Sequence, residues 1–437
     1  MFRKIADAFR IKDIRQRLLF VLLCLFIIRV GSQIPVPGVN REYFSAWFEA
    51  QTGNAFNFFD AFTGGSFSSM SILALSITPY ITSSIIMQLL TIAIPALEEM
   101  QKEGEDGRKK IAAITRYVTV GLSLFESIAM TVGFGNQGLI PGMTFVKALT
   151  VVVCLTAGSS FLMWIGEQIT DKGIGNGISM VLLINIVSRV PNDLSNLYEN
   201  FVKGRTVARG VLAGIIIIAI IIALVVLVVL LNDSERSIPV QYSRKVVGRR
   251  TMGGQSSHIP LKVNTAGVIP VIFASSIMEF PGIIATFAGK SNPGGFWGGL
   301  ISMLNSNNWF TWSTPWYNVG LLIYILLVIF FAYFYTSITF NPIEIADNIK
   351  KQGGFVPGIR PGRPTTDYLN RILKYIIFIG AAGLCIVAIL PFFFNGIFKA
   401  HVSFGGTSII IIVGVILETV KQIESMMVVR NYKGFLG

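Results

Sequence analysis

Charged residues are scarce in this chain of 437 residues: Asp, Glu, Lys and Arg make up 14% of it. Soluble domains average about a quarter charged residues. Hydrophobic residues make up 52%, and the mean hydropathy is +0.65. We therefore predict an integral membrane protein whose loops are too short to form a second soluble domain.

Cysteine and histidine are also rare, at three and two residues. Cys24, Cys154 and Cys385 lie in apolar runs without CxxC spacing, which argues against a disulfide framework or a zinc site. His258 has no carboxylate near it in the sequence and is expected to be a loop residue. No paired acid–base or metal-binding set is present, so a membrane enzyme is the weakest of the candidate functions.

Nucleotide-binding loops are absent as well. The glycine-rich stretch 173–177 precedes a membrane helix and follows no strand, and Gly289-Lys290-Ser291 has Ile284 where a phosphate loop needs glycine. We expect no cofactor and no metal. Energy for any transport must then come from a partner.

Long apolar runs are what the chain does have. A helix needs about 20 apolar residues to cross a bilayer, and by this criterion we predict ten spans. They lie near Leu18–Ile34, Ser71–Ile94, Ala112–Phe134, Val146–Gln168, Gly177–Pro191, Val211–Leu231, Ala266–Ala288, Asn318–Phe340, Ile372–Phe394 and Thr407–Val428.

The basic residues are divided unequally by these spans. With both termini and every second loop on one side, 27 of the 36 Lys and Arg residues fall on that side. This positive-inside pattern predicts that both termini are cytoplasmic. It also explains the net charge of +13 better than nucleic-acid binding does. Arg29 lies inside the first span, and the other side receives eight: Arg41, Lys147, Arg189, Lys203, Arg205, Arg209, Lys290 and Lys399.

Two halves of five spans each are expected, 1–202 and 203–437. An odd number of spans per half gives the halves opposite orientations, as in inverted-repeat membrane proteins. Spans two and seven mix small polar and apolar residues and carry Pro79 and Pro270, which we interpret as breaks. The predicted fold class is an all-α polytopic membrane protein with two inverted pseudo-symmetric halves.

The second predicted span is polar for a lipid-facing helix, because it holds eight Ser, Thr or Gln residues. Such groups find no hydrogen-bond partners in lipid, so one side of this helix should face protein or a water-filled path. At about 100° per residue, one stripe of this helix carries isoleucines near mid-depth and polar side chains beyond them. The stripe is typical of a channel wall and consists of Ile77, Ile81, Ser84, Ile85, Gln88 and Thr91.

The loop after span eight, 341–371, contains the stretch Lys350–Pro364. Within it, two prolines and two glycines flank Arg360 directly, in the sequence Pro357-Gly358-Ile359-Arg360-Pro361-Gly362. These residues predict a rigid turn with Arg360 at its tip. An ordinary positive-inside anchor is one interpretation. A docking site for an acidic partner is the other, because anchoring does not require a stiffened backbone. The loop 232–265 after span six is also basic.

Seven short motifs are spread over nearly the whole chain. They are Ile34-Pro35-Val36-Pro37-Gly38, Ile77-Thr78-Pro79-Tyr80-Ile81, Gly104-Glu105-Asp106-Gly107-Arg108-Lys109, Gly173-Ile174-Gly175-Asn176-Gly177-Ile178-Ser179, Ala266-Gly267-Val268-Ile269-Pro270, 355–362 and Gly405-Gly406-Thr407-Ser408. In sequence and in order they resemble the motifs of the SecY family, the channel-forming subunits of bacterial protein translocases.

The resemblance implies a gated polypeptide channel in the bacterial cytoplasmic membrane. Its two halves would surround a central hourglass pore that a ring of aliphatic side chains narrows. Apolar side chains at a constriction disfavour water and ions and offer a passing chain no specific hydrogen bonds. From composition alone, simple helix packing is the other interpretation of these isoleucines. The resemblance assigns the ring to Ile77, Ile81, Ile178, Leu182, Ile272 and Ile411.

The resemblance also identifies 56–69 as a plug segment, with Phe59, Phe62, Gly64 and Gly65, where the glycines allow a hinge or an abrupt helix end. A plain re-entrant outer loop is the alternative. Spans two and seven would form a lateral gate through which signal sequences reach lipid. Its expected polar residues are Thr82, Glu126 and Ser276. A second buried acid, Glu279, has no assigned role; a contact with Arg29 is one option.

The partners that the resemblance implies are small SecE-like and SecG-like membrane subunits, a SecA-type motor ATPase, a ribosome and signal-bearing polypeptides. The expected docking residues are Arg244, Arg249, Arg250 and Arg360. A secondary transporter remains the competing class from residues alone, but it needs charged or ion-coordinating groups at mid-depth. Spans five, six and nine lack acidic residues near their centres.

Overall fold

The computed structural model describes most of the chain, apart from the two ends and several loops. The described residues are 9–50, 60, 62–136, 138, 140, 142–201, 203, 207–242, 245–247, 250–252, 256–287, 295–305, 308–310, 315–398 and 406–433.

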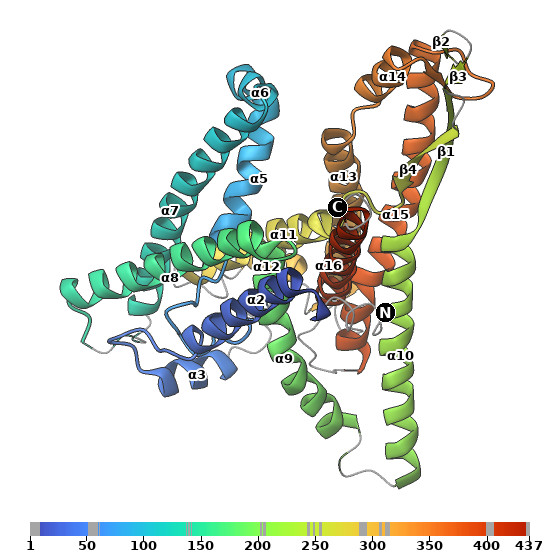
Figure 1. Cartoon of the computed structure of the whole chain (residues 1–437). Helices are drawn as coiled ribbons and strands as arrows, with labels where there is room; N and C mark the ends of the chain where they lie inside the picture. The colour runs from blue at the N-terminus through green and yellow to red at the C-terminus, as the bar shows by residue number, and fades with distance from the viewer. Residues whose placement is uncertain are drawn as a thin grey trace.

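Helices dominate the described structure, and each of the ten predicted spans coincides with one of them (Figure 1). By length and hydropathy alone, five described helices can cross a membrane, and the bent pair α5 and α6 makes a sixth. The protein therefore has an all-α polytopic membrane fold. The helices are α2 (Lys12–Gly31), α3 (Arg41–Ala50), α5 (Thr78–Ala93), α6 (Pro95–Lys102), α7 (Glu105–Asn136), α8 (Phe145–Lys172), α9 (Gly177–Phe201), α10 (Val207–Asp233), α11 (Ile269–Phe287), α12 (Phe296–Leu304), η2 (Pro315–Tyr317), α13 (Asn318–Thr339), α14 (Pro342–Lys351), α15 (Arg363–Phe398) and α16 (Gly406–Lys433).

Early and late helices gather on opposite sides of the molecule (Figure 1). Helices α2, α3 and α5–α8 lie on one side, and α10 and α13–α15 lie on the other. Helices α9 and α16 pack against each other between the two groups. The bend between α5 and α6 and the hairpin of β1 and β4 protrude from the same end of the molecule.

Pro79 and Pro270 begin helices, and our interpretation of them as breaks is wrong. Pro79 is the second residue of α5, and Pro270 is the second residue of α11. Proline is tolerated in a first turn because its missing N–H would have no helical partner there. Span two is accordingly shorter than predicted: residues 71–77 form turns, and the helix begins at Thr78.

Helix α9 is longer than predicted, because it continues through Pro191 to Phe201. An internal proline removes one backbone hydrogen bond but does not have to end a helix. Arg189 therefore lies well inside α9.

A small β structure in the basic loop after α10 adds to the expected all-α fold. Strand β1 pairs antiparallel with β4 and with β5, while β2 pairs with β3. Ile238 and Val240 of β1 are buried on alternating positions, together with Leu261 of β4. This period-2 pattern is the strand signal that the sequence analysis missed. The strands are β1 (Glu235–Tyr242), β2 (Lys245–Val247), β3 (Arg250–Met252), β4 (Ser256–Lys262) and β5 (Gly354–Phe355).

The apolar core consists of separate clusters that follow this arrangement. One cluster joins α3, α7 and α8, and a second joins α10, α11, α13, α15 and α16. A third packs the strands against α14 and α15. A fourth combines residues of α2, α8, α9 and α16 with the chain around Ile77, and this central cluster contains the site described next.

Candidate functional site: a central aliphatic cluster and its plug segment

The six aliphatic residues expected to form the ring lie in one hydrophobic cluster. They come from four parts of the chain: the start of α5, the first turns of α9, the start of α11 and the start of α16. Their separation in sequence means that only the tertiary fold brings them together. Ile77, Leu182 and Ile411 are buried, and Ile81, Ile178 and Ile272 pack against them partly exposed.

Two glycines hold α8 and α9 close together beside this cluster. A Cβ on Gly177 would lie 1.8 Å from the carbonyl oxygen of Gly166. A Cβ on Gly166 would meet Ile77 and Ile178 at 3.5 Å each. Because Gly177 immediately precedes Ile178, the contact between the two helices sets where Ile178 enters the cluster.

Gly177→Ala is therefore expected to lower thermal stability and to displace Ile178. The added methyl cannot fit against backbone, and overpacking of this kind costs about 1–3 kcal/mol. Thermal unfolding of the purified protein in detergent is the measurement. Gly121→Ala on α7 is the control, because a methyl group added there would have nothing within 4 Å. Equal stability of the two variants would contradict the packing argument.

The described part of the plug segment ends a short helical stretch and then folds into turns. Asp60, Phe62 and Thr63 are helical, and the helical stretch stops at Gly64. Gly64 and Gly65 have φ of +67° and +84°, values that glycine adopts without strain. Phe62 is buried in the central cluster. Phe59 lies outside the described residues.

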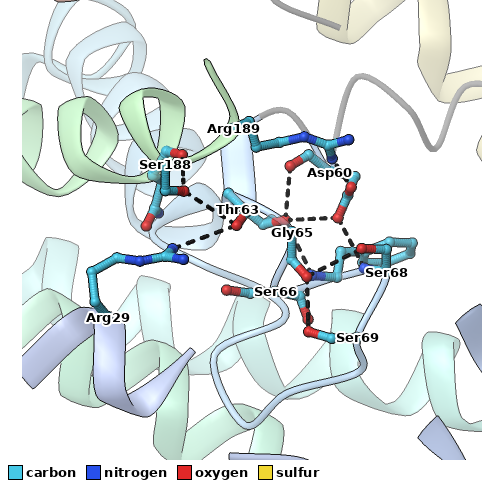
Figure 2. Close-up of polar contacts among 12 residues, drawn as sticks. Arg29, Asp60, Thr63, Gly65, Ser66, Ser68, Ser69, Ser188 and Arg189 are labelled. Carbon is cyan, nitrogen blue, oxygen red and sulfur yellow. Dashed lines mark hydrogen bonds and ion pairs between the residues drawn. The ribbon is translucent and has the colours of Figure 1, made fainter. Parts of the chain in front are cut away.

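A polar network joins the plug segment to α9 and α2 (Figure 2). Asp60, 1% exposed, forms an ion pair with Arg189 of α9. The Gly64 carbonyl accepts hydrogen bonds from Arg29 Nη1 at 3.4 Å and Ser188 Oγ at 3.3 Å. Sequence reasoning assigned no role to Asp60 or Arg189; a lone acid in an aromatic and glycine-rich segment was the available signal.

Arg29 thus has a partner other than the one considered from sequence. Its guanidinium donates to the plug segment, and it lies at the end of α2. The side chain of Glu279 lies outside the described part of the structure. A contact between these two residues is therefore untested.

An apolar groove of about 390 Å³ opens between α5, α11 and α13. Two of the three expected gate residues, Thr82 and Ser276, line it. Thr82 Oγ1 donates to the carbonyl of Thr78 in its own helix, at 3.1 Å, so this hydroxyl is bonded within α5. Glu126 is half-buried on α7 and is not among the described lining residues. The lining also includes Phe62, Ile81, Leu182 and Ile272, so the groove reaches the central cluster.

Arg360 is exposed in a tightly bonded turn between β5 and α15. Gly358 and Gly362 have φ of +82° and +100°, and the Ile359 N–H donates to the Val356 carbonyl at 3.0 Å. The Arg360 carbonyl accepts a hydrogen bond of 2.9 Å from Thr365 Oγ1.

The other expected docking residues belong to the loop after α10. Arg250 begins strand β3. Arg244 and Arg249 lie outside the described residues. The structure therefore gives a defined geometry to Arg360 alone among the four.

Helix α16 connects the two groups of helices by side-chain contacts that the sequence did not suggest. Gln422 Oε1 accepts a hydrogen bond of 2.6 Å from the backbone N–H of Gly175, just before α9. The neighbouring Lys421 pairs with Asp233, at the end of α10, at 2.6 Å. Asp233 ends α10, two residues before β1 begins.

Comparisons with known proteins identify the family of this chain. The SecY family model matches residues 71–420. The protein translocase subunit SecY of Halalkalibacterium halodurans is 44% identical over 443 residues, with 100% of both chains covered. The corresponding subunit of Bacillus subtilis is 42% identical over 446 residues, again with 100% of both chains covered.

Solved structures share the fold at lower identity. A protein-conducting channel has a TM-score of 0.64 and 19% identity, over 94% of this chain and 92% of that chain. Sec61 from a canine ribosome–channel complex has a TM-score of 0.63 and 19% identity with the same coverage. These likenesses show the fold, and the matches along the full sequence show the family. The chain therefore belongs to the SecY family of protein translocase subunits.

Proposed function

We propose that this chain is a gated channel that passes unfolded secretory polypeptides across the bacterial cytoplasmic membrane and releases apolar segments sideways into lipid. The observation that carries the proposal is the meeting of six aliphatic side chains from four helices in one central cluster. Such a constriction resists water and ions and still yields to a polypeptide of nearly any sequence. No catalytic step is part of this role.

The plug segment is proposed to close this constriction in the idle state. Phe62 packs into the same cluster as Ile77 and Leu182, and this contact supports the proposal. Its displacement would expose the central cluster to a passing chain. The phenyl ring also lines the groove, so an apolar segment entering there would reach the plug.

The groove between α5 and α11 is proposed as the lateral gate. It is lined mainly by aliphatic and aromatic side chains, and it runs from the central cluster toward the outer faces of both helices. An apolar signal helix would gain by burying its surface there, at about 25 cal/mol per Å². Thr82 and Ser276 are the polar residues that would set the minimum hydrophobicity a segment needs in order to be accepted.

Apolar replacements at the gate, Thr82→Val with Ser276→Ala, are expected to lower the stringency of signal recognition. Each removed hydroxyl is worth about 1 kcal/mol, so export of a precursor with a weakened signal should rise about fivefold per residue. The measurement is the export ratio of weak-signal to normal-signal precursors. Thr150→Val on α8, which removes a similar hydroxyl bonded within its own helix at 2.8 Å, is the matched control. An unchanged ratio in the gate variants would refute their role.

The membrane topology is proposed from the basic residues. Both termini and the two protrusions would lie in the cytoplasm, where most of the Lys and Arg residues gather. The two inverted halves, 1–202 and 203–437, would meet around the pore. The hydrogen bond from the Gly175 N–H to Gln422 Oε1 crosses from one half to the other and supports a joint between them.

The driving force is proposed to come from a SecA-type motor ATPase or a ribosome bound at the basic loops. Sec61 is described in a ribosome–channel complex, and this supports a ribosome as one partner. Arg360 is proposed as the leading contact, with Arg244, Arg249 and Arg250 beside it. Small SecE-like and SecG-like subunits would complete the complex, with the SecE-like subunit clamping the halves.

Reconstitution tests the function directly. The full chain is placed in vesicles with the small membrane subunits of its own cell, and a signal-bearing precursor, a motor and ATP are added. We expect the precursor to become protected from added protease inside the vesicles. Precursor that stays accessible, while the motor hydrolyses ATP normally, would overturn the proposal.

A further inference from the structure

We infer that Asp60 and Arg189 are the residues that set the threshold for release of the plug segment, by means of a buried ion pair that is stable only while the segment is seated on α9. The inference rests on the channel function proposed above. The ion pair is then the contact that must break when the channel opens.

The position of the pair is the first step of the argument. Asp60 is 1% exposed, and the side chain of Arg189 is 22% exposed. Asp60 belongs to the plug segment, and Arg189 belongs to α9, which also carries Ile178 and Leu182 of the central cluster. The pair therefore links the segment that must move to a helix that forms the constriction.

Asp60 also organises the plug segment itself (Figure 2). Its Oδ1 accepts a hydrogen bond of 2.8 Å from the backbone N–H of Ser68, and the Thr63 hydroxyl lies 3.5 Å away. Thr63 Oγ1 in turn accepts from the backbone N–H of Phe67 at 3.2 Å. One carboxylate thus closes the turn of the segment and ties that turn to α9.

The surrounding contacts are weaker and mostly neutral. A Cβ on Gly64 would lie 2.7 Å from the Asn185 carbonyl oxygen, so the segment is pressed against α9 at this point. Its carbonyl accepts two long hydrogen bonds, from Arg29 and Ser188. Among the contacts described between the segment and α9, the ion pair is the one between two full charges.

A buried ion pair responds asymmetrically to substitution. Removing one partner leaves an uncompensated buried charge, which is strongly unfavourable, whereas removing both is often nearly neutral. When the plug segment leaves α9, water can solvate both groups. An unpaired charge therefore disfavours the seated state and favours release.

A second acid makes the two partners unequal. Asp193 lies four residues after Arg189 on the same face of α9, and it is 1% exposed. The Arg189 charge interacts with Asp193 as well as with Asp60. Loss of Arg189 thus leaves both buried acids, Asp60 and Asp193, without its positive charge. Loss of Asp60 leaves Arg189 still beside Asp193.

The test measures the ion conductance of idle channels in planar bilayers. The full chain is used with its small subunits, and the variants are Asp60→Asn, Arg189→Gln, both together, and Arg189→Lys. We expect the open fraction to rise about tenfold for Asp60→Asn and more for Arg189→Gln, consistent with loss of one partner of a buried pair. The double variant should fall below Arg189→Gln, and Arg189→Lys should stay near wild type.

Arg29→Gln is the matched control, because it removes a charged donor to the same segment but breaks no described ion pair; its open fraction should change less than threefold. Single variants that conduct like wild type would overturn the inference. So would a double variant that leaks as much as Arg189→Gln, because that result indicates a role in shape and not in charge. Arg189→Lys separates the inference from misfolding, since it keeps the charge.

The proposed function fails in a different way. A signal peptide of ordinary hydrophobicity is added to wild-type channels in the same bilayers. Conductance that stays absent there and in every variant would refute the channel itself. A wild type that opens with the peptide while the single variants stay shut without it would refute only the ion-pair threshold.

Discussion

Arg360→Glu is expected to abolish motor-driven movement of precursor while the protein still inserts and folds. Reversing a charge at the centre of a docking interface costs about 2–5 kcal/mol, which is about 30-fold to 5,000-fold in affinity. Precursor translocation into vesicles at fixed motor concentration is the measurement. Membrane level and thermal stability should match wild type, because the Arg360 side chain is exposed.

The geometry of the turn is the reason for so large an effect at one residue. Gly358 and Gly362 adopt positive φ, and hydrogen bonds at Ile359 and Thr365 fix the backbone between them. Strand β5 anchors the turn to β1. A preorganised loop loses little conformational entropy on binding, so its contacts contribute most of their free energy to affinity.

Arg236→Glu is the control for this prediction. Arg236 is exposed on β1 of the same protrusion, where it pairs in register with Leu261 of β4. It carries the same charge outside the stiffened turn and should lower translocation less than threefold. Normal translocation in Arg360→Glu, or equal loss in both variants, would remove Arg360 as the leading contact.

Serine at two positions of the central cluster, Ile81→Ser with Ile411→Ser, is expected to make idle channels leak ions. Each change removes about three carbon groups from a dry constriction, at about 0.8 kcal/mol per CH₂. A hydration barrier lower by about 2 kcal/mol corresponds to roughly a 30-fold faster ion flux, and the double variant should exceed that. Ion flux through idle channels in planar bilayers is the measurement.

Ile92→Ser provides the matched comparison, because Ile92 lies on the same helix as Ile81 but is 52% exposed. Ile81→Leu is a second one, which preserves an aliphatic side chain in the cluster. Both should conduct like wild type. If Ile92→Ser leaks ions as strongly as the double variant, the leak comes from general damage to the protein. If the double variant Ile81→Ser with Ile411→Ser does not leak, the cluster is not the seal.

Composition and run length were sufficient to predict the membrane class and ten segments that each overlap a helix. These properties are local, because a segment must satisfy its own backbone hydrogen bonds in lipid whatever its neighbours are. Helix boundaries were less predictable. Pro79 and Pro270 start helices and Pro191 lies within one, since proline in a first turn costs nothing and an internal proline can be accommodated.

The β structure after α10 was missed for a different reason. Only Ile238, Val240 and Leu261 give the alternating signal, and they do so in a loop rich in basic residues. Its stability comes from packing on α14 and α15. Such packing depends on segments about a hundred residues away in the chain.

The sequence by itself determined that this protein resides in a membrane, which motifs it shares with its family and which isoleucines were candidates for a constriction. Only the tertiary structure decided that these side chains meet, that Gly177 lies against Gly166, and that Asp60 pairs with Arg189. The physical reason is that helix formation depends on neighbours within a few residues. A ring, a glycine contact or an ion pair depends on distances between segments that are far apart in the chain.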